Sequence, residues 1–456
     1  MSNSRDYQFI ESTVSLCPGC LRRLDAKIVQ RGGSIYLLKH CPEHGAQEEL
    51  LEEDAVYYRN RMAYDKPGTL SKTQTERGDG CPFDCGLCPE HDQHTCIGLI
   101  EVTSNCDLKC PVCYASSGSG GDYLPLEKIG AMIEFFRDSE YGNAEILQLS
   151  GGEPATHPQI VDILKLARAK VKYVFLNTNG LRIAEDEGFA RELGQFSGGF
   201  EIYLQFDGFD GKTHERLRGR DLSEVKQKAI ANLAKYKVPV TLVTTVAKGV
   251  NDGELGRIVE FGINAPNIRG INFQPVAFWG RLGNVDKKDR VTITGIIDRL
   301  EKQTKGMLKK SDFIPLPCDV DRVALTYLYR TGGGFTPLTR DLDIKNYLPV
   351  IKNTFNFDPE DFMKDLAGKV PGGSACCCGA DLLKNFKKVI PVEYLRKSEQ
   401  KKIEYVNENT FRISATSFID AHNFDMKSMK KECVHVITPD LKKIPFSAYN
   451  MLYRNK

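Results

Sequence analysis

The sequence lacks the features that mark membrane-spanning and exported proteins. Its 456 residues contain no run of about 18 or more consecutive apolar residues, so no segment is predicted to span a membrane. The first residues, MSNSRDYQFIEST, show no basic stretch followed by an apolar one, so no secretory signal is predicted. These absences favour a cytoplasmic protein.

A large net charge is also missing. The 62 Lys and Arg residues nearly balance the 60 Asp and Glu residues, which leaves a formal net charge of +2. A nucleic-acid-binding protein needs a basic surface to neutralise phosphates, so no nucleic-acid partner is expected. Histidine is scarce, with eight residues in the chain, so acid–base chemistry by histidine has few candidates.

Cysteine, in contrast, is abundant, and a chain of this length is expected to hold two or three modules. The cytosol keeps thiols reduced, which argues against disulfides and leaves metal binding as the better explanation for 15 cysteines. The cysteines fall into groups, as metal ligands do: Cys17, Cys20 and Cys41; Cys81, Cys85, Cys88 and Cys96; Cys106, Cys110 and Cys113; Cys318 with Cys376, Cys377 and Cys378; and Cys433.

The chain is organised around one stretch, GLIEVTSNCDLKCPVCY, at residues 98–114. Its first half alternates apolar and polar residues, which predicts a buried strand over 99–103. Cys106, Cys110 and Cys113 follow with C-x3-C-x2-C spacing, and Tyr114 comes directly after them. Three thiolates can hold three irons of a [4Fe–4S] cluster and leave the fourth iron open to another ligand. A zinc knuckle or a disulfide loop is the alternative.

This spacing, with the aromatic residue behind it, resembles the cluster motif of the radical S-adenosylmethionine superfamily. The resemblance implies that Cys106, Cys110 and Cys113 are the catalytic ligands, and that the open iron chelates the amino and carboxylate groups of S-adenosylmethionine. An electron from the reduced cluster then frees a 5′-deoxyadenosyl radical, which takes hydrogen from a C–H bond. A non-catalytic iron–sulfur electron carrier is the alternative, but it leaves the glycine motif described below unexplained.

Beyond the cluster loop, strands and helices alternate. Such alternation predicts a parallel sheet with right-handed crossovers. The family resemblance implies an α/β fold, a partial (β/α)6 TIM-type barrel, with its chemistry at the carboxyl ends of the strands. The predicted core covers 98–285, with strands at 99–103, 145–149, 173–176, 200–206, 240–246 and 270–275, and helices at 124–140, 159–170, 187–195, 223–237 and 253–261.

Further polar and glycine motifs stand at the predicted strand ends. Gly151, Gly152 and Glu153 form a GGEP motif that resembles the family motif for the amino group of S-adenosylmethionine. Taken alone, this motif and the later NTNG sequence would be ordinary turns, and Asp207 an ordinary helix cap. The resemblance implies a cofactor-binding role for Gly151, Gly152 and Glu153, and for Tyr114, Asn177, Asn179, Gln205, Asp207, Thr244 (with Thr245) and Gln274.

The N-terminal module, expected over 1–75, contains two short cysteine motifs. Cys17-Pro-Gly-Cys20 and Cys41-Pro-Glu-His44 are separated by a predicted strand over 34–38. Three thiolates and one imidazole suit a single tetrahedral ion, either zinc or a rubredoxin-like iron. Because four protein ligands would close the site, a structural role is favoured over a redox role. A helix over 53–64 is expected to pack this module onto the next.

Two later regions carry the remaining cysteines. In the bridge, 76–97, Cys81, Cys85 and Cys88 repeat the C-x3-C-x2-C spacing, and Cys96 supplies a fourth thiolate that would close an auxiliary [4Fe–4S] cluster; zinc is the alternative. In the C-terminal region, 286–456, Cys318 and members of the triplet Cys376, Cys377 and Cys378, with Cys433, could form a second auxiliary cluster. A single buried cysteine and an incidental triplet would be the alternative.

The layout as a whole resembles one branch of the superfamily, which holds archaeal tetraether lipid synthases and pterin C-methylating enzymes. The shared sequences include CPGC, CPEHG, GCPFDCGLCPEH and PFSAYN. The resemblance implies C–C bond formation, with coupling of sp3 lipid carbons as the main expectation and methylation of a dihydropterin as the alternative. The expected partners are a small-molecule or lipid substrate and an electron donor such as ferredoxin or flavodoxin. The basic stretch 384–402 could rest on anionic lipid at the inner membrane face, or be a solvated helix.

Overall fold

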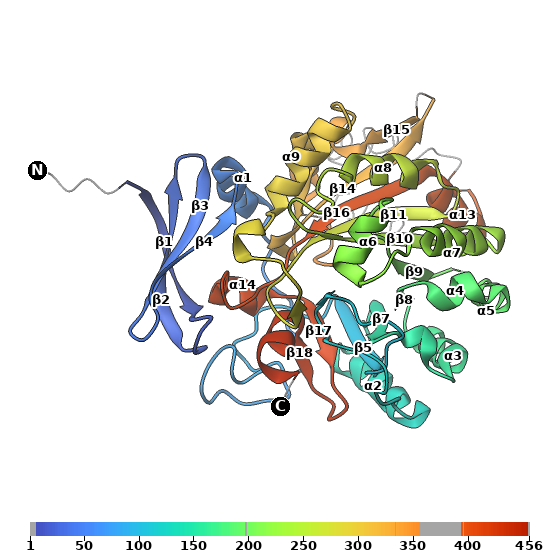
Figure 1. Ribbon diagram of the computed structural model, residues 1–456, viewed down its shortest axis with the longest axis horizontal. Helices are drawn as coiled ribbons and strands as arrows, with labels where there is room; N and C mark the ends of the chain where they lie inside the picture. The colour runs from blue at the N-terminus through green and yellow to red at the C-terminus, as the bar shows by residue number, and fades with distance from the viewer. Residues whose placement is uncertain are drawn as a thin grey trace, which may run out of the picture.

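The structure is a computed structural model, and it describes residues 6–196, 198–332, 334–349, 351–355, 394 and 396–454. Figure 1 shows a small N-terminal sheet beside a larger sheet that is covered by helices. The cysteine triplet at 376–378 and most of the basic stretch 384–402 lie outside the described residues. In the part of the chain that is described, no helix is both long and apolar enough to cross a membrane.

The N-terminal sheet is antiparallel, with its four strands in chain order. Alternate residues of its strands are buried, as expected for a sheet with one covered face. The helix predicted over 53–64 forms as a short α-helix followed by a 3-10 turn. The elements are β1 (Gln8–Leu16), β2 (Arg23–Arg31), β3 (Ser34–Cys41), β4 (Gly45–Glu52), α1 (Ala55–Asn60) and the 3-10 turn Arg61–Tyr64.

The core sheet confirms the predicted α/β fold. Its six predicted strands form and pair in parallel in chain order. The strands are β5 (Ile97–Thr103), β7 (Ile146–Gly151), β8 (Tyr173–Thr178), β9 (Phe200–Gln205), β10 (Val240–Val246) and β11 (Ile268–Pro275). The helices between them are α2 (Leu126–Ser139), α3 (Ile160–Lys170), α4 (Leu181–Glu185), α5 (Glu187–Leu193), α6 (Gly211–Arg218), α7 (Ser223–Lys235) and α8 (Leu255–Asn264).

The helices pack on the sheet through one apolar face. In α2, Ile129, Met132, Ile133 and Phe136 follow helical spacing and are completely buried. Each such side chain contributes roughly 1.5–3 kcal/mol by leaving water. The Phe136 ring packs so closely on β5 that a Cβ at Gly98 would lie 2.8 Å from it, which explains a glycine within this strand.

Segments from the C-terminal region extend the same sheet at both edges. β16 (Thr410–Thr416) pairs in parallel with β11, and β17 (Val434–Ile437) pairs in parallel with β5. The sheet therefore places eight parallel strands side by side, and its strand order runs from β13 to β18 without closing. Figure 1 shows β16 beside β11 and β17 beside β5.

The remaining elements lie at the edges of the sheet and around its ends. The strands are β13 (Ile314–Leu316), β14 (Asp319–Thr331), β15 (Gly334–Pro337), β18 (Lys443–Pro445) and the short pair β6 (Val112–Cys113) and β12 (Arg281–Leu282). The helices are α9 (Ile293–Gln303), α13 (Glu399–Asn409), α14 (Met426–Lys431), α15 (Phe446–Ala448) and a π-turn, Tyr449–Tyr453. Further 3-10 turns are Pro154–Thr156, Lys287–Asp289, Lys310–Asp312, Leu338–Arg340 and Ile344–Tyr347.

Candidate functional site

A cavity of about 290 Å³ lies at the carboxyl ends of the parallel strands. This size is near the lower end of the range for small-molecule sites, about 300–1,000 Å³. Side chains from all eight parallel strands and from the cluster loop surround it. It brings together these predicted site residues: Cys106, Cys110, Cys113, Tyr114, Gly151, Gly152, Glu153, Asn177, Asn179, Gln205 and Gln274.

The three-cysteine loop follows β5 and forms one wall of this cavity. Cys113 lies in β6 and pairs with Arg281 of β12, which fixes the end of the loop. Burial raises the pKa of the Cys106 thiol to about 12, and it also raises the pKa of the Cys110 thiol. The cation of Arg218 favours the thiolate of Cys110. Since thiolates are the metal ligands, metal binding at this loop must release protons.

The two glycines of the GGEP motif pack directly on the cluster loop. A Cβ at Gly151 would lie 2.1 Å from the Thr103 carbonyl oxygen, and one at Gly152 would lie 2.2 Å from the Asn105 carbonyl oxygen. The backbone N–H groups of Gly152 and Glu153 donate to these same oxygens, each at 2.8 Å. The motif therefore joins the end of β7 to the cluster loop, and only glycine allows this approach.

The buried carboxylate of Glu153 accepts three hydrogen bonds. The carboxylate accepts from Thr178 Oγ1 at 2.6 Å, from the Asn179 backbone N–H at 2.7 Å and from the Ala155 backbone N–H at 3.0 Å. Burial nevertheless raises the pKa of the Glu153 carboxyl to about 7. A cationic ammonium group bound beside it would favour the charged form, which suits a site for the amino group of an amino acid.

Hydrogen bonds from neighbouring residues fix the polar groups at the ends of β8 and β9. Asn179 Nδ2 donates to Asp107 Oδ1 of the cluster loop at 2.6 Å. The buried Lys226 ammonium donates to the Asn179 carbonyl oxygen and to Gln205 Oε1, the latter at 3.3 Å. Tyr114, next to the last cysteine, forms a hydrogen bond of 3.0 Å with Ser150 on β7.

Two of the predicted cofactor-binding residues do not line the cavity. Asp207 is completely buried, and its carboxylate forms a bidentate ion pair with Arg218 at 2.6 and 2.7 Å. Arg218 lines the cavity in its place and holds the pKa of the Asp207 carboxyl below its usual value. Thr244 points to the other side of β10 and donates to the Phe206 carbonyl oxygen, whereas Thr245 lines the cavity. The alternation of side chains along a strand explains this correction.

The N-terminal cysteines and His44 form one compact group. Their four ligand atoms lie within 4.8 Å of one another. The sulfurs of Cys20 and Cys41 are 3.8 Å apart, and His44 Nδ1 lies 3.5 Å from the sulfurs of Cys17 and Cys41. A tetrahedral zinc with Zn–S bonds of about 2.3 Å requires sulfurs about 3.8 Å apart. These residues therefore fit a closed mononuclear site.

A second group joins cysteines that are far apart in the sequence. The sulfurs of Cys96, Cys318 and Cys433 lie within 4.8 Å of one another, and those of Cys318 and Cys433 are 3.8 Å apart. All three cysteines are buried. His94 Nε2 lies 3.6 Å from the Cys96 sulfur. The structure thus brings Cys96 to Cys318 and Cys433.

The other three cysteines of the bridge lie at a separate place. Cys81, Cys85 and Cys88 line a small cavity together with Asp84, Glu90 and His91, and Cys96 does not reach it. The grouping of Cys96 with these three residues, expected from their order in the sequence, is therefore not the one in the structure. The reason is that Cys96 immediately precedes β5, where its backbone N–H donates to the Cys433 carbonyl oxygen at 2.9 Å.

Comparison with known proteins identifies the family. Residues 100–262 match the family model of the Radical SAM superfamily, and residues 9–53 match that of the HMPTM N-terminal zinc ribbon domain. The chain is 35% identical to a 7,8-dihydro-6-hydroxymethylpterin dimethyltransferase of Methanocaldococcus jannaschii, over 98% of this chain and 94% of that protein. The chain belongs to the radical S-adenosylmethionine superfamily.

More distant similarities cover less of the chain. It is 29% identical to a probable GTP 3′,8-cyclase of Thermococcus kodakarensis over 37% of this chain and 53% of that protein. Among solved structures, Streptococcus suis SuiB bound to S-adenosylmethionine aligns with 46% of this chain and 47% of that chain, at 17% identity and a TM-score of 0.39.

Membership in the radical S-adenosylmethionine superfamily confirms the fold class and the enzyme class predicted from the sequence. The predicted cofactors, an iron–sulfur cluster and S-adenosylmethionine, agree with the family, and the zinc ribbon match favours zinc over iron in the N-terminal group.

Sequence reasoning missed several polar residues inside the cavity of this radical S-adenosylmethionine enzyme, among them Gln148, Tyr203, Asn272 and Arg218. For Gln148 a signal was available, because counting back in twos from Gly152 along β7 gives Ser150 and Gln148 on the same face.

Proposed function

We propose that this radical S-adenosylmethionine enzyme methylates a carbon atom of a dihydropterin. The observation that carries the proposal is the similarity to the pterin dimethyltransferase, which extends over nearly the full length of both chains. It supports the pterin alternative more than the tetraether lipid expectation. The amide side chains within the largely apolar lining of the cavity also favour a heterocycle, because an alkyl chain would bury these amides without hydrogen bonds.

In this proposal Cys106, Cys110 and Cys113 hold the catalytic [4Fe–4S] cluster. When bound, the cluster supplies the electron that cleaves S-adenosylmethionine into methionine and a 5′-deoxyadenosyl radical. Glu153 receives the amino group of S-adenosylmethionine, and the strand ends of β8 and β9 contact the rest of that cofactor through Asn179 and Gln205. Arg218 and Asp207 position the cluster loop, since Arg218 also donates to the Val112 carbonyl oxygen at 3.3 Å.

The other cysteine groups are assigned supporting roles. Cys17, Cys20, Cys41 and His44 hold a structural zinc ion. Cys96, Cys318 and Cys433 hold an auxiliary metal centre, and Cys81, Cys85 and Cys88 belong to a further one. An external one-electron donor of the ferredoxin or flavodoxin type is expected to reduce the catalytic cluster.

The test is a product analysis of the anaerobically reconstituted protein. It is incubated with dithionite, S-adenosylmethionine and 7,8-dihydro-6-hydroxymethylpterin, with cell extract as the source of any further carbon donor. The expected result is 5′-deoxyadenosine together with a methylated pterin, both detected by mass spectrometry. A parallel incubation contains archaeal lipid in place of the pterin. If 5′-deoxyadenosine forms with the lipid and no methylated pterin forms with the pterin, the pterin assignment is rejected. Failure to form 5′-deoxyadenosine under any condition would point to an electron carrier.

A further inference from the structure

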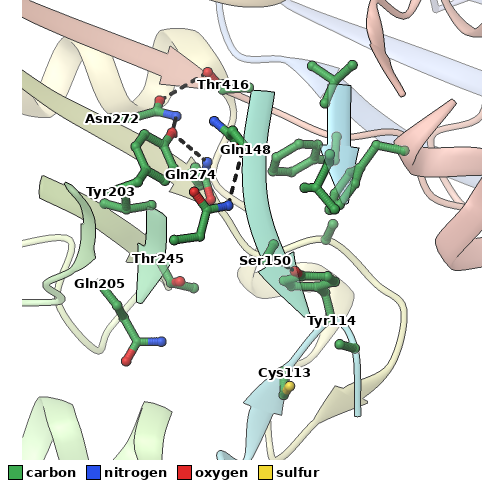
Figure 2. A pocket seen from close by; sticks show the side chains of 18 of the residues that line it. Cys113, Tyr114, Gln148, Ser150, Tyr203, Gln205, Thr245, Asn272, Gln274 and Thr416 are labelled. Atoms are coloured by element: carbon green, nitrogen blue, oxygen red, sulfur yellow. Dashed lines mark hydrogen bonds between the residues drawn. The ribbon is translucent and has the colours of Figure 1, made fainter. Parts of the chain in front are cut away.

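Two networks of side-chain amides line the cavity, and together they form the amide layer. The first joins β7 to β8, and the second joins β9, β11 and β16. Figure 2 shows both networks in the same part of the cavity, with Cys113 and Tyr114 toward the strand ends. They touch each other in the sheet, because Asn177 of the first is the direct strand partner of Tyr203 of the second.

The first network consists of Gln148 and Asn177. Asn177 Nδ2 donates to Gln148 Oε1 at 3.1 Å. Within the described residues, the Gln148 amide N–H groups have no hydrogen-bond acceptor, and Asn177 Oδ1 is buried without a donor. The pair thus keeps one unused donor group and one unused acceptor. Turning both amides over exchanges the two atoms but leaves the same number of each.

The second network is centred on the Tyr203 hydroxyl. Asn272 Nδ2 and Gln274 Nε2 both donate to this oxygen, the latter at 3.3 Å. Asn272 Oδ1 accepts from the hydroxyls of Ser414 and Thr416 at 3.1 and 3.0 Å. Asn272 is therefore held by hydrogen bonds at both its amide nitrogen and its amide oxygen. Among the described residues, Gln274 Oε1 has no donor, so it remains available as an acceptor.

The cavity lining beside these amides is largely apolar. The rings of Phe175 and Tyr203 are nearly parallel, with 11° between their planes and 6.2 Å between their centroids, and both line the cavity. Ile146, which also lines the cavity, lies on β7 two residues before Gln148. A ligand in this layer would therefore meet apolar surface on a face and amide groups along an edge. This combination fits a planar heterocycle with adjacent donors and acceptors.

We propose that Gln148 and Gln274, held by Asn177 and by Tyr203 with Asn272, bind the amino-oxo-pyrimidine edge of a pterin ring. The proposal rests on the proposed function and names the residues that select its substrate. A ring carbonyl accepts from the Gln148 amide N–H, and a ring or exocyclic N–H donates to Gln274 Oε1. Buried amides left without such partners are costly, so a ligand without polar edges is rejected.

The location of this layer suits the chemistry of the superfamily. Gln148 lies two residues before Ser150, which places it roughly 6.6 Å along the strand from the residue that contacts Tyr114. Gln148 therefore lies deeper in the cavity than the strand ends, where the cofactor groups are expected. A ring in the amide layer would therefore present its other edge toward the place where C–H bonds are attacked.

The test is equilibrium binding of 7,8-dihydro-6-hydroxymethylpterin to the full, reconstituted protein with S-adenosylmethionine and without a reductant. Dissociation constants are measured by ligand fluorescence for the unmodified protein, Gln148→Leu and Gln274→Leu. Gln227→Leu, at an exposed position of α7, is the matched control. Each cavity variant is expected to bind the pterin about tenfold more weakly or worse, since about 1.4 kcal/mol corresponds to a factor of ten. The control is expected to bind it unchanged.

A second measurement separates pterin recognition from damage to the site. The spectral response of the cluster to S-adenosylmethionine is expected to be the same in all four proteins. If Gln148→Leu loses its cluster, Gln148→Glu replaces it, because an ionised carboxylate retains the acceptor for Asn177 and puts a charged acceptor in the place of the donor. An unchanged pterin dissociation constant in a cluster-containing cavity variant overturns this inference while leaving the function standing. Absence of pterin binding by the unmodified protein instead overturns the proposed function.

Discussion

At the scale of single residues, the site depends on how closely backbone atoms approach. Gly151 and Gly152 leave no room for a methyl group, because the carbonyl oxygens of the cluster loop occupy that space. The same loop is tied to β8 by the hydrogen bond between Asp107 and Asn179. The carboxylate of Glu153 is oriented by three donors, so it cannot turn away from the cavity without losing them.

Gly152→Ala is expected to lower S-adenosylmethionine cleavage by tenfold or more. Its new Cβ would overlap the Asn105 carbonyl oxygen and push the cluster loop away from β7. The measurement is the rate of 5′-deoxyadenosine formation at matched iron content. Gly253→Ala is the control, because a Cβ at that position meets no atom within 4 Å. Equal rates for the two variants would contradict the packing argument.

Replacing Cys106, Cys110 or Cys113 by Ala is expected to abolish S-adenosylmethionine cleavage, because each removes one of three ligands that cannot be substituted from nearby. The zinc content is expected to stay unchanged, since the N-terminal group lies on a different sheet. An assay of 5′-deoxyadenosine formation and a metal analysis of the same samples test the loss of cleavage and the unchanged zinc content. Normal 5′-deoxyadenosine formation in any of the three would rule out the assignment.

At the scale of elements, the N-terminal sheet is fastened to the core through buried polar contacts. Glu52, at the end of β4, accepts from the backbone N–H of Thr294 in α9 at 3.2 Å and from its hydroxyl. Nearby, Arg290 links Glu49 of β4 to Asp420, with distances of 2.7 and 2.8 Å. The metal group and this interface are therefore two separate supports of the module.

Glu52 makes the stability of this interface depend on pH. Complete burial raises the pKa of its carboxyl from 4.5 to about 7, so the folded protein holds a proton that the unfolded chain releases. Stability is therefore expected to fall as pH rises from 4.5 to 7, by at most about 3 kcal/mol. The free energy of unfolding of Glu52→Gln should not show this fall with pH. Unfolding free energies between pH 5 and 8 test it, with Glu260→Gln on the surface of α8 as the control; parallel curves for all three proteins would refute it.

Changing both Cys17 and Cys20 to Ala is expected to remove one zinc ion and to lower the thermal stability of the N-terminal sheet. The rate of S-adenosylmethionine cleavage per catalytic cluster should stay within about twofold, because the zinc ligands lie outside the cavity. Metal analysis and a melting curve provide the readout. Retention of the full zinc content by the double variant would show that the group binds no ion.

At the scale of the whole molecule, the large sheet brings together segments from distant parts of the chain. Cys96 precedes β5, Cys318 lies between β13 and β14, and Cys433 precedes β17. Strand pairing of β17 with β5 places the first and last of these side by side. The same pairing continues the parallel sheet that surrounds the cavity, so the auxiliary group and the active site share one framework.

Cys318→Ser is expected to remove metal from this distant group and to leave the catalytic cluster responsive to S-adenosylmethionine. A protein without Cys106, Cys110 and Cys113 should show the reverse, with a remaining iron signal that S-adenosylmethionine does not alter. Iron analysis and electron paramagnetic resonance of both proteins test this separation. An iron content in Cys318→Ser equal to that of the unmodified protein would exclude Cys318 as a ligand.

The sequence by itself determined the core strands, the cluster loop and the N-terminal metal group. These features depend on residues that are close together in the sequence, such as the alternating residues of β5 and the C-x3-C-x2-C spacing that follows them. They can therefore be predicted without knowing which distant segments pack against them. Only the tertiary structure decided that Cys96 joins Cys318 and Cys433, because strand pairing between distant segments sets that distance. It also decided that Thr245 rather than Thr244 lines the cavity, that Asp207 is neutralised by Arg218, and that Gln148 and Gln274 line the same cavity. Which face of a strand is buried, and what lies opposite it, follows from the packing of the whole sheet.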